Sequence, residues 1–354
     1  MKKIILSIAL VLLSLFCFSC TNNNKNSVLK IYNAGEYIDP EVIEDFKKEY
    51  NIEVIYDVFE TNEEMYPIVE IGSVKYDVVC PSDYMIQKMI QNNLLKEIDT
   101  NKLTNYENIK KSSLEISKQF DENNNYSIPY MEGTVGILCN NTLLKEKNLP
   151  LPTSWKDLWK EEYKDEILMQ NSVRDAFLVA LKKNGYSLNS TNKQEIDKAT
   201  NELITQKPLV QAYVVDQVRD KMIGGEALIG VIYSGELLYI LDEANGEYDY
   251  SYILPKEGTN TWIDSWVITK DAQNIDNAYL WLDFLLREDI SKRNAEYITY
   301  DTTNEKAQNL LNDLYDRKNK ITKDYTNNNN EVFKYLGVDT ENYYNDSWKK
   351  IKSN

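Results

Sequence analysis

The 354-residue sequence predicts an α/β fold with largely parallel sheets and helices on both sheet faces. Two observations predict this fold class. Apolar runs typical of strands alternate with amphipathic stretches typical of helices, and polar, tyrosine-containing segments follow several of the apolar runs. The chain is 42% hydrophobic and 27% charged, as expected for a protein with a real core, and it is long enough for two domains.

The first half of the chain shows the alternation most simply. Asp39 can cap a helix whose first turn holds Pro40 and whose apolar face contains Val42 and Phe46. We therefore expect strands at residues 28–34, 52–59 and 75–82, and helices at residues 39–50 and 84–95.

The second half continues in the same way. Ser154 is a suitable N-cap for one helix, and Gly185 is a suitable stop for another. The expected strands are 133–140, 227–235 and 265–270, and the expected helices are 154–163, 174–186, 193–207 and 275–289. The run of asparagines at 327–330 predicts an exposed loop.

Composition excludes several classes of function. The sequence has no histidine, so it can form neither a Ser-His-Asp triad nor a His-ligated zinc site. No strand end supplies an acid pair with a third catalytic group, so we expect no enzyme, no cofactor and no metal. The net charge of -16 disfavours nucleic acid as a partner and attracts cations.

The N-terminus predicts export and lipidation. Lys2 and Lys3 precede an apolar run that ends in "FCFSC", which resembles a bacterial lipoprotein signal peptide over residues 1–20, cleaved before Cys20 and lipidated there. An ordinary secretory peptide is the alternative. Residues 21–27 are polar and read as a tether. Cys80 and Cys139 lie in apolar stretches, where buried free thiols are expected over a disulfide.

Aromatic and polar side chains cluster after predicted strands. Ligands of parallel α/β sheets gather at the carboxyl ends of strands, and these ends offer Tyr37, Ser82, Tyr84 and Tyr233. In "TWIDSW", Trp262, Asp264 and Trp266 would share one face of a strand. A carboxylate between indoles can hold an organic cation, by charge pairing and through the ring faces.

Several stretches carry a resemblance to a known family. They include "IYNAGEYI", "YDVVCPSDYMIQKM", "SWKDLWKEEYKDEILM", "RDAFLVALKKNGYS", "PKEGTNTWIDSWVI" and "ITYDTTN". Over residues 29–303 the chain resembles the spermidine/putrescine-binding proteins of bacterial polyamine ABC importers, which are periplasmic solute receptors. The resemblance implies a two-domain periplasmic binding protein-like α/β fold with a ligand cleft between the domains. It implies a first domain of residues 28–134 plus 259–300 and a second of residues 135–258 plus 301–354.

The resemblance also implies roles for individual residues. Asp264 would hold one terminal ammonium, and Trp262 and Tyr233 would line the methylene chain. Tyr37, Ser82, Tyr84 and Tyr300 would complete the cage with hydroxyl acceptors, and Asp175 would face the far end of the ligand. Trp266 is expected in the core.

This sequence departs from the family pattern at several positions. Ala34 and Tyr233 replace tryptophans, Ser172 replaces an aspartate, and Phe333 falls where an amide is usual. Glu36 and Glu132 are nearby acids that could compensate for the lost charge, and together with Ser172 they are further candidates for the ligand site.

The expected function is therefore a monomeric, lipid-anchored receptor in the periplasm or on the cell surface, which delivers putrescine or spermidine to ABC permease subunits. The alternatives are a receptor for another small cation, ferric ion included, and a sensor or surface lipoprotein that transports nothing.

Overall fold

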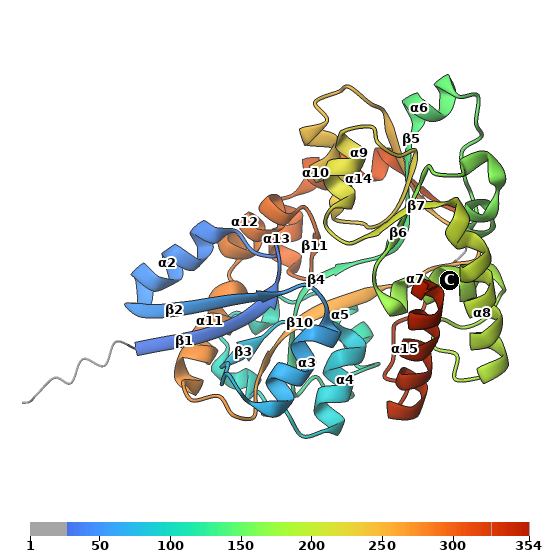
Figure 1. Ribbon diagram of the computed structural model, residues 1–354. Coiled ribbons are helices and arrows are strands. Elements are labelled where there is room, and N and C mark those ends of the chain that lie inside the picture. The colour runs from blue at the N-terminus through green and yellow to red at the C-terminus, as the bar shows by residue number, and fades with distance from the viewer. Residues whose placement is uncertain (1–26, 327, 354) are drawn as a thin grey trace, which may run out of the picture.

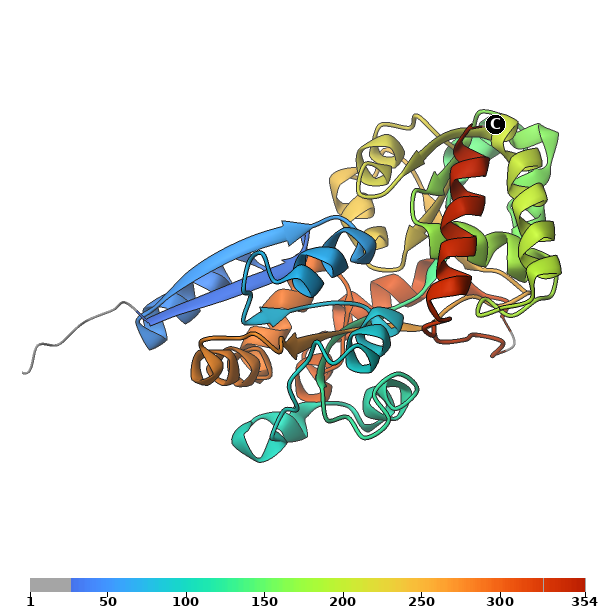
Figure 2. The same ribbon diagram turned by 60° about the horizontal axis from the view of Figure 1, so that its bottom comes forward.

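The computed structural model describes residues 27–326 and 328–353, and the strands of these residues form two six-stranded sheets. Each sheet is the centre of a separate lobe flanked by helices, and the same two lobes remain distinct when the molecule is turned (Figures 1 and 2). The predicted α/β class is confirmed. The predicted signal peptide, its Cys20 and almost all of the predicted tether lie outside the described residues.

The first sheet has the strand order β11-β4-β10-β3-β1-β2. Strands β1, β2 and β3 are parallel, whereas β10 runs antiparallel to both β3 and β4. Its strands are β1 (Ser27–Ala34), β2 (Ile52–Phe59), β3 (Val78–Val79), β4 (Ser127–Gly133), β10 (Trp262–Ile268) and β11 (Asp301–Thr302).

The second sheet has the order β12-β9-β5-β8-β6-β7, and β5 is antiparallel to both of its neighbours. Its strands are β5 (Val135–Asn140), β6 (Ile167–Gln170), β7 (Val210–Val214), β8 (Ile229–Tyr233), β9 (Tyr250–Leu254) and β12 (Thr322–Asp324). The expectation of parallel sheets is therefore wrong where β10 pairs with β3 and β4, where β11 pairs with β4, and where β5 pairs with β8 and β9. In each of these pairs at least one strand enters or leaves a sheet at a crossing between the lobes, so no helical crossover forces the pair to be parallel.

Helices cover both sheets (Figure 1). Around the first sheet lie α2 (Pro40–Tyr50), α3 (Asn62–Ile71), α4 (Asp83–Gln91), α5 (Lys111–Ser117), α11 (Ile275–Leu285), α12 (Glu288–Ile298) and α13 (Glu305–Asn309), with the short 3-10 turns η1 (Thr100–Lys102) and η2 (Tyr106–Asn108). Around the second lie α6 (Asn141–Glu146), α7 (Val173–Lys183), α8 (Lys193–Gln206), α9 (Val218–Ile223), α10 (Glu236–Glu243), α14 (Asn312–Ile321) and α15 (Val338–Ser353), with η3 (Trp155–Trp159), η4 (Glu161–Tyr163) and η5 (Lys207–Leu209).

The chain passes between the sheets three times within the described residues. The crossings lie between β4 and β5, between β9 and β10, and between β11 and β12. The first is a single residue, Thr134, so the expected strand at 133–140 is divided between the end of β4 and all of β5. Residues Asp301–Thr302 pair with β4 in the first sheet, two residues beyond the domain boundary expected at residue 300.

Several predicted elements differ in extent, among them the helix expected at 84–95, which ends at Gln91, and the strand expected at 265–270, which begins at Trp262. The strand expected at 75–82 is reduced to Val78–Val79. The backbone of Asp77 still bonds to Lys30 and Thr269, but its buried carboxylate accepts the backbone N–H groups of Lys30, Gln273 and Asn274, so that a side chain replaces a strand carbonyl beside Lys30. Pro81 has no N–H to give. Ser154 caps as expected, but residues 155–163 form two 3-10 turns because Lys160 is extended.

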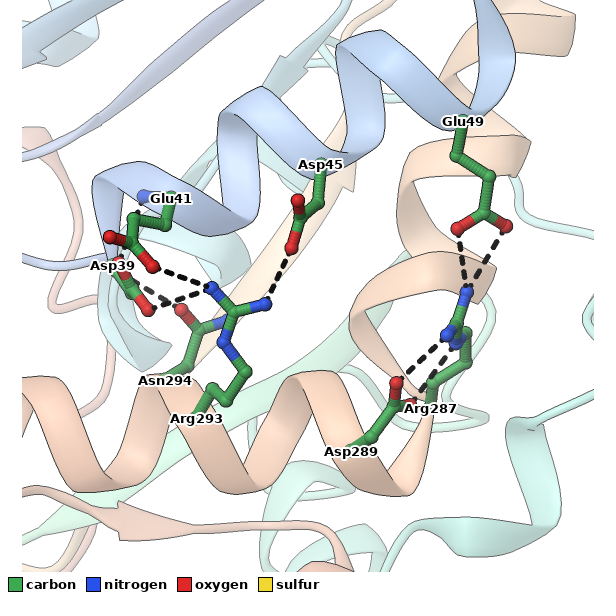
Figure 3. A network of polar contacts seen from close by, with 8 residues as sticks. All are labelled: Asp39, Glu41, Asp45, Glu49, Arg287, Asp289, Arg293 and Asn294. Carbon is green, nitrogen blue, oxygen red and sulfur yellow. Dashed lines mark hydrogen bonds and ion pairs between the residues drawn. The ribbon is translucent and has the colours of Figure 1, made fainter.

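The helix expected at 275–289 is divided in two. Helix α11 ends at Leu285, and α12 begins at Glu288, after the extended residue Arg287. The guanidinium of Arg287 contacts Glu49 on α2 and Asp289 on α12 (Figure 3). Arg293 of α12 reaches Asp39 and Asp45, at 3.3 and 2.6 Å, and the Asn294 side chain accepts from the Asp39 N–H. These contacts fix the start of α2, immediately after the loop that carries Tyr37.

No helix in the described ranges combines the length and apolar character needed to cross a bilayer.

Candidate functional site

A cavity lies between the two lobes and is lined by residues from both. It encloses about 1030 Å³ of space not filled by protein atoms, including solvent at its mouth. The lining includes every residue that the sequence analysis assigned firmly to the ligand: Tyr37, Ser82, Tyr84, Asp175, Tyr233, Trp262, Asp264 and Tyr300. Residues predicted from strand ends and residues implied by the family resemblance, Asp175 and Tyr300, therefore lie in one place. Their roles in binding stay predictions.

The three further candidates, Glu36, Glu132 and Ser172, differ in whether they line the cavity. Glu36 and Ser172 line the cavity. Glu132 is not among the lining residues, because its carboxylate is bound by Lys110 at 2.5 Å and by the Ser113 hydroxyl at 2.7 Å. An acid already neutralised by a neighbouring lysine is a poor candidate to replace a missing ligand contact.

Asp264 lies at the centre of strand β10, where the pairing with β4 shifts register between Asp264 and Ser265. The Tyr37 hydroxyl donates to its Oδ2 at 2.8 Å, while its Oδ1 is buried without a hydrogen-bond partner among the described residues. Burial raises the pKa of Asp264 to about 6, although the hydroxyls of Ser82 and Tyr37 counteract the shift. No side chain of the described residues acts as a counter-ion to this carboxylate, so an ammonium group would satisfy it.

Asp175 offers a second acid on the opposite lobe. It lies in the first turn of α7, and the side chain of Ser172 caps that helix. The Tyr233 hydroxyl donates to Asp175 Oδ2 at 2.8 Å. Burial raises the pKa of Asp175, against the effect of this hydrogen bond. Within the described part of the chain neither Asp175 nor Asp264 forms an ion pair.

Aromatic rings line the cavity between these acids. The rings of Trp262 and Tyr300 are 5.6 Å apart, and Tyr233 meets Trp262 edge-on at 6.3 Å. Glycines make room for them, since a Cβ at Gly133 would lie 2.5 Å from the Trp262 ring and one at Gly235 would lie 2.1 Å from the Tyr300 ring. Apolar ring faces suit methylene groups and attract nearby cations.

The cavity tyrosines form a repeated pattern of hydroxyl–carboxylate pairs. Each hydroxyl donates to an acid: Tyr37 to Asp264 at 2.8 Å, Tyr84 to Glu63 at 2.9 Å, Tyr233 to Asp175 at 2.8 Å and Tyr300 to Glu236 at 2.7 Å. Burial, followed by the nearby carboxylates, raises the pKa of all four phenols. The hydroxyls therefore stay protonated and hold the acids in place, with lone pairs left to accept from a ligand amine.

Several charged residues of the cavity escaped the sequence analysis. They are Glu60, Glu63, Arg174, Asp216, Arg219 and Glu236. Seven carboxylates and two arginines line the cavity, a formal charge of -5 that favours a cation. Glu236 lies three residues after Tyr233, in the stretch "YSGE", and could have been found there. Asp216 and Arg219 follow strand β7, which is not among the expected strands.

Two further expectations are confirmed. Trp266 is 1% exposed and packs edge-on against Trp281 in the core, away from the cavity. Cys80 and Cys139 are buried free thiols.

The sequence and structure have clear relatives. The family model described as "Bacterial extracellular solute-binding protein" matches residues 73–329, and a second, "Hypothetical lipoprotein (MG045 family)", matches residues 1–130. The spermidine/putrescine-binding periplasmic protein of Escherichia coli is 39% identical over 83% of this chain and 82% of its own length.

Solved structures agree with these matches. A Listeria monocytogenes protein, provisionally assigned as a spermidine/putrescine ABC transporter, has a TM-score of 0.83 at 37% identity over 92% of this chain and 99% of its own. The spermidine/putrescine ABC transporter substrate-binding protein PotD of Streptococcus pneumoniae has a TM-score of 0.74 at 34% identity over 92% and 99%.

Proposed function

This chain belongs to the bacterial extracellular solute-binding proteins, among the relatives of the spermidine/putrescine-binding receptors of ABC importers, and from this premise we propose that it captures a polyamine outside the cytoplasm. Its fold and family are those of transport receptors and not of enzymes, as the sequence predicted. The ligand class in the proposal is putrescine or spermidine, and the receiving partner is an ABC permease.

The observation that carries the proposal is the pair of cleft acids without counter-ions. Asp264 and Asp175 stand on opposite lobes, each held by a tyrosine hydroxyl. A polyamine is an apolar chain bearing ammonium groups whose pKa is near that of lysine, roughly 10.4. It would satisfy both acids with its amines and place its methylenes against Trp262 and Tyr233. The formal charge of -5 on the lining supports a ligand with more than one positive charge.

Binding involves no chemistry on the ligand in this proposal. The domains would comprise residues 28–134 plus 259–309 and residues 135–258 plus 310–354, with the boundary expected at residue 300 moved beyond β11 and α13, and they would be joined by the three crossings. A ligand that contacts both domains favours the closed arrangement, because only that arrangement lets both acids reach amines at once. The permease would then recognise the closed receptor.

We also propose that the receptor is a monomer anchored by lipid at Cys20, in the periplasm or on the cell surface. The "FCFSC" end of the apolar leader and the lipoprotein family match over residues 1–130 support this anchor. Mass spectrometry of the N-terminal peptide of membrane-extracted protein tests it. A free N-terminus without acyl groups would contradict lipidation and leave the solute proposal untouched.

Calorimetric titration of residues 21–354 tests the ligand class. The protein is unfolded and refolded to remove carried-over ligand, then titrated with putrescine, spermidine and cadaverine. We expect at least one of them to bind with micromolar or tighter affinity. No heat from any of the three would contradict the polyamine proposal and would favour another small cation or a non-transport role, and native mass spectrometry of unstripped protein would then identify the solute.

Ser172 gives a sharper test of the far end of the cleft. Ser172→Asp keeps a good helix cap and adds a carboxylate beside Asp175. We expect spermidine to bind about tenfold more tightly, because one charge-assisted hydrogen bond contributes about 1.5–3 kcal/mol, partly offset by repulsion from Asp175. Ser172→Asn is the matched control, since it has the same shape without the charge. An equal gain from both variants would show that shape, not charge, is responsible.

A further inference from the structure

One corner of the cleft is already occupied by a cation that belongs to the protein. Arg219 on α9 makes two contacts with Glu236, one of them at 3.0 Å, and Glu236 at the start of α10 is only 3% exposed. Glu236 also accepts the Tyr300 hydroxyl at 2.7 Å. Across the cleft, Glu36 of the first lobe approaches the Arg219 guanidinium at 3.6 Å. Arg219 is thus placed where acids of both lobes meet.

Two other acids of the cleft are held differently from Glu236. Asp264 and Asp175 each have a tyrosine hydroxyl but no ion pair in the described residues, and Asp264 Oδ1 has no partner at all there. Among the acids of the cleft, Asp264, Asp175 and Glu63 are each held by a tyrosine hydroxyl without an ion pair in the described residues, whereas the buried Glu236 is already neutralised by Arg219. A guanidinium held by two hydrogen bonds to a buried carboxylate is not easily displaced.

We propose that Arg219 takes the place of a ligand amine, so that the cleft selects a diamine over a triamine. This inference rests on the proposed binding of amines in the cleft. Two ammonium groups satisfy Asp264 and Asp175, and a third directed towards Glu236 meets a positive charge that already holds its carboxylate. Repulsion between the two cations, and the desolvation of an amine without a free acid, both weaken binding of the longer ligand.

The test is the ratio of affinities for putrescine and spermidine in wild type and in Arg219→Met. Wild type is expected to prefer putrescine. Removing the guanidinium frees Glu236 for the third amine, so spermidine should gain about tenfold, the effect of one charged hydrogen bond, and putrescine much less. Spermidine acetylated on one terminal amine keeps the chain but loses that charge, and it should gain no more than putrescine.

Control variants separate this role from a structural one. Arg219→Lys keeps the positive charge and should retain the wild-type preference, while Arg219→Met/Glu236→Gln removes both charges and should abolish the gain in spermidine binding. Arg287→Met removes an arginine with two acidic contacts outside the cleft (Figure 3) and should leave the ratio unchanged. These variants also keep the proposal testable if Arg219→Met folds poorly.

Each other outcome would overturn the inference. Equal gains for both amines would mean that Arg219 only weakens the general negative field of the cleft. Equal losses of affinity for both amines would mean that Arg219 only supports the fold. Wild-type protein that prefers spermidine would directly contradict the proposed selection of a diamine. Wild type that binds no amine would instead remove the proposed function, which is a distinguishable result because it appears before any variant is made.

Discussion

Asp264→Asn is expected to lose polyamine binding by a factor of tens to thousands while keeping the fold. The substitution preserves the shape of the side chain and an oxygen that can accept from Tyr37, but it removes the charge that an ammonium would pair with. Removing one partner of a buried charge pair costs about 2–5 kcal/mol, at about 1.4 kcal/mol for each tenfold change in affinity. Calorimetric titration against wild type measures the loss.

The stability of the same variant supplies its control. In the ligand-free protein the pKa of Asp264 is raised to about 6, so at neutral pH the buried carboxylate destabilises the folded state relative to the unfolded one. The asparagine is neutral, so ligand-free Asp264→Asn should melt no lower than ligand-free wild type. Wild-type binding by this variant would show that Asp264 is not in the ligand site, and a large drop in melting temperature would show that it is structural.

Local sequence signals were sufficient for much of the fold. Asp39 and Pro40 placed the start of α2, and Ser154 was found as a cap, because such residues act on backbone groups a few positions away. The extents of β3 and of the helix expected at 275–289 were missed for the opposite reason. Asp77 and Arg287 fix those ends through partners 196 and 238 residues away in the chain, which local periodicity does not contain.

The residues of the candidate site also divide into those that the sequence predicts and those that it does not. Residues directly after β1, β3 and β8 could be brought together from the rule that ligands collect at strand ends. Asp216 and Arg219 also follow a strand, β7, but residues 210–214 are not among the expected strands, so the rule could not be applied to them. The tyrosine hydroxyls were expected only as acceptors, since nothing local reveals that each lies against a carboxylate.

Acidification should weaken binding through Asp264. Below about pH 6 this carboxylate takes up a proton in the ligand-free protein, so the form that pairs with an ammonium becomes scarce. The ligand keeps its charge at this pH, because amine pKa values lie several units higher. We therefore expect affinity to be level above about pH 7 and to fall by about tenfold for each unit below 6, and more steeply if Asp175, whose pKa is also raised, titrates with it.

Acidification should weaken ligand binding but stabilise the ligand-free protein. This opposite sign distinguishes titration of Asp264 from acid unfolding. A carboxyl whose folded-state pKa is raised gives ligand-free protein a stability that grows as pH falls from about 6 towards about 4, the unfolded value. Tyr37→Phe removes a hydrogen bond that favours the carboxylate, so its binding midpoint should move to higher pH, while Asp264→Asn should lose this part of the pH dependence. Wild-type affinity that is equal at pH 7 and pH 5 would contradict a role for Asp264 as the charged contact, because no other change in that interval would restore the lost ion pair.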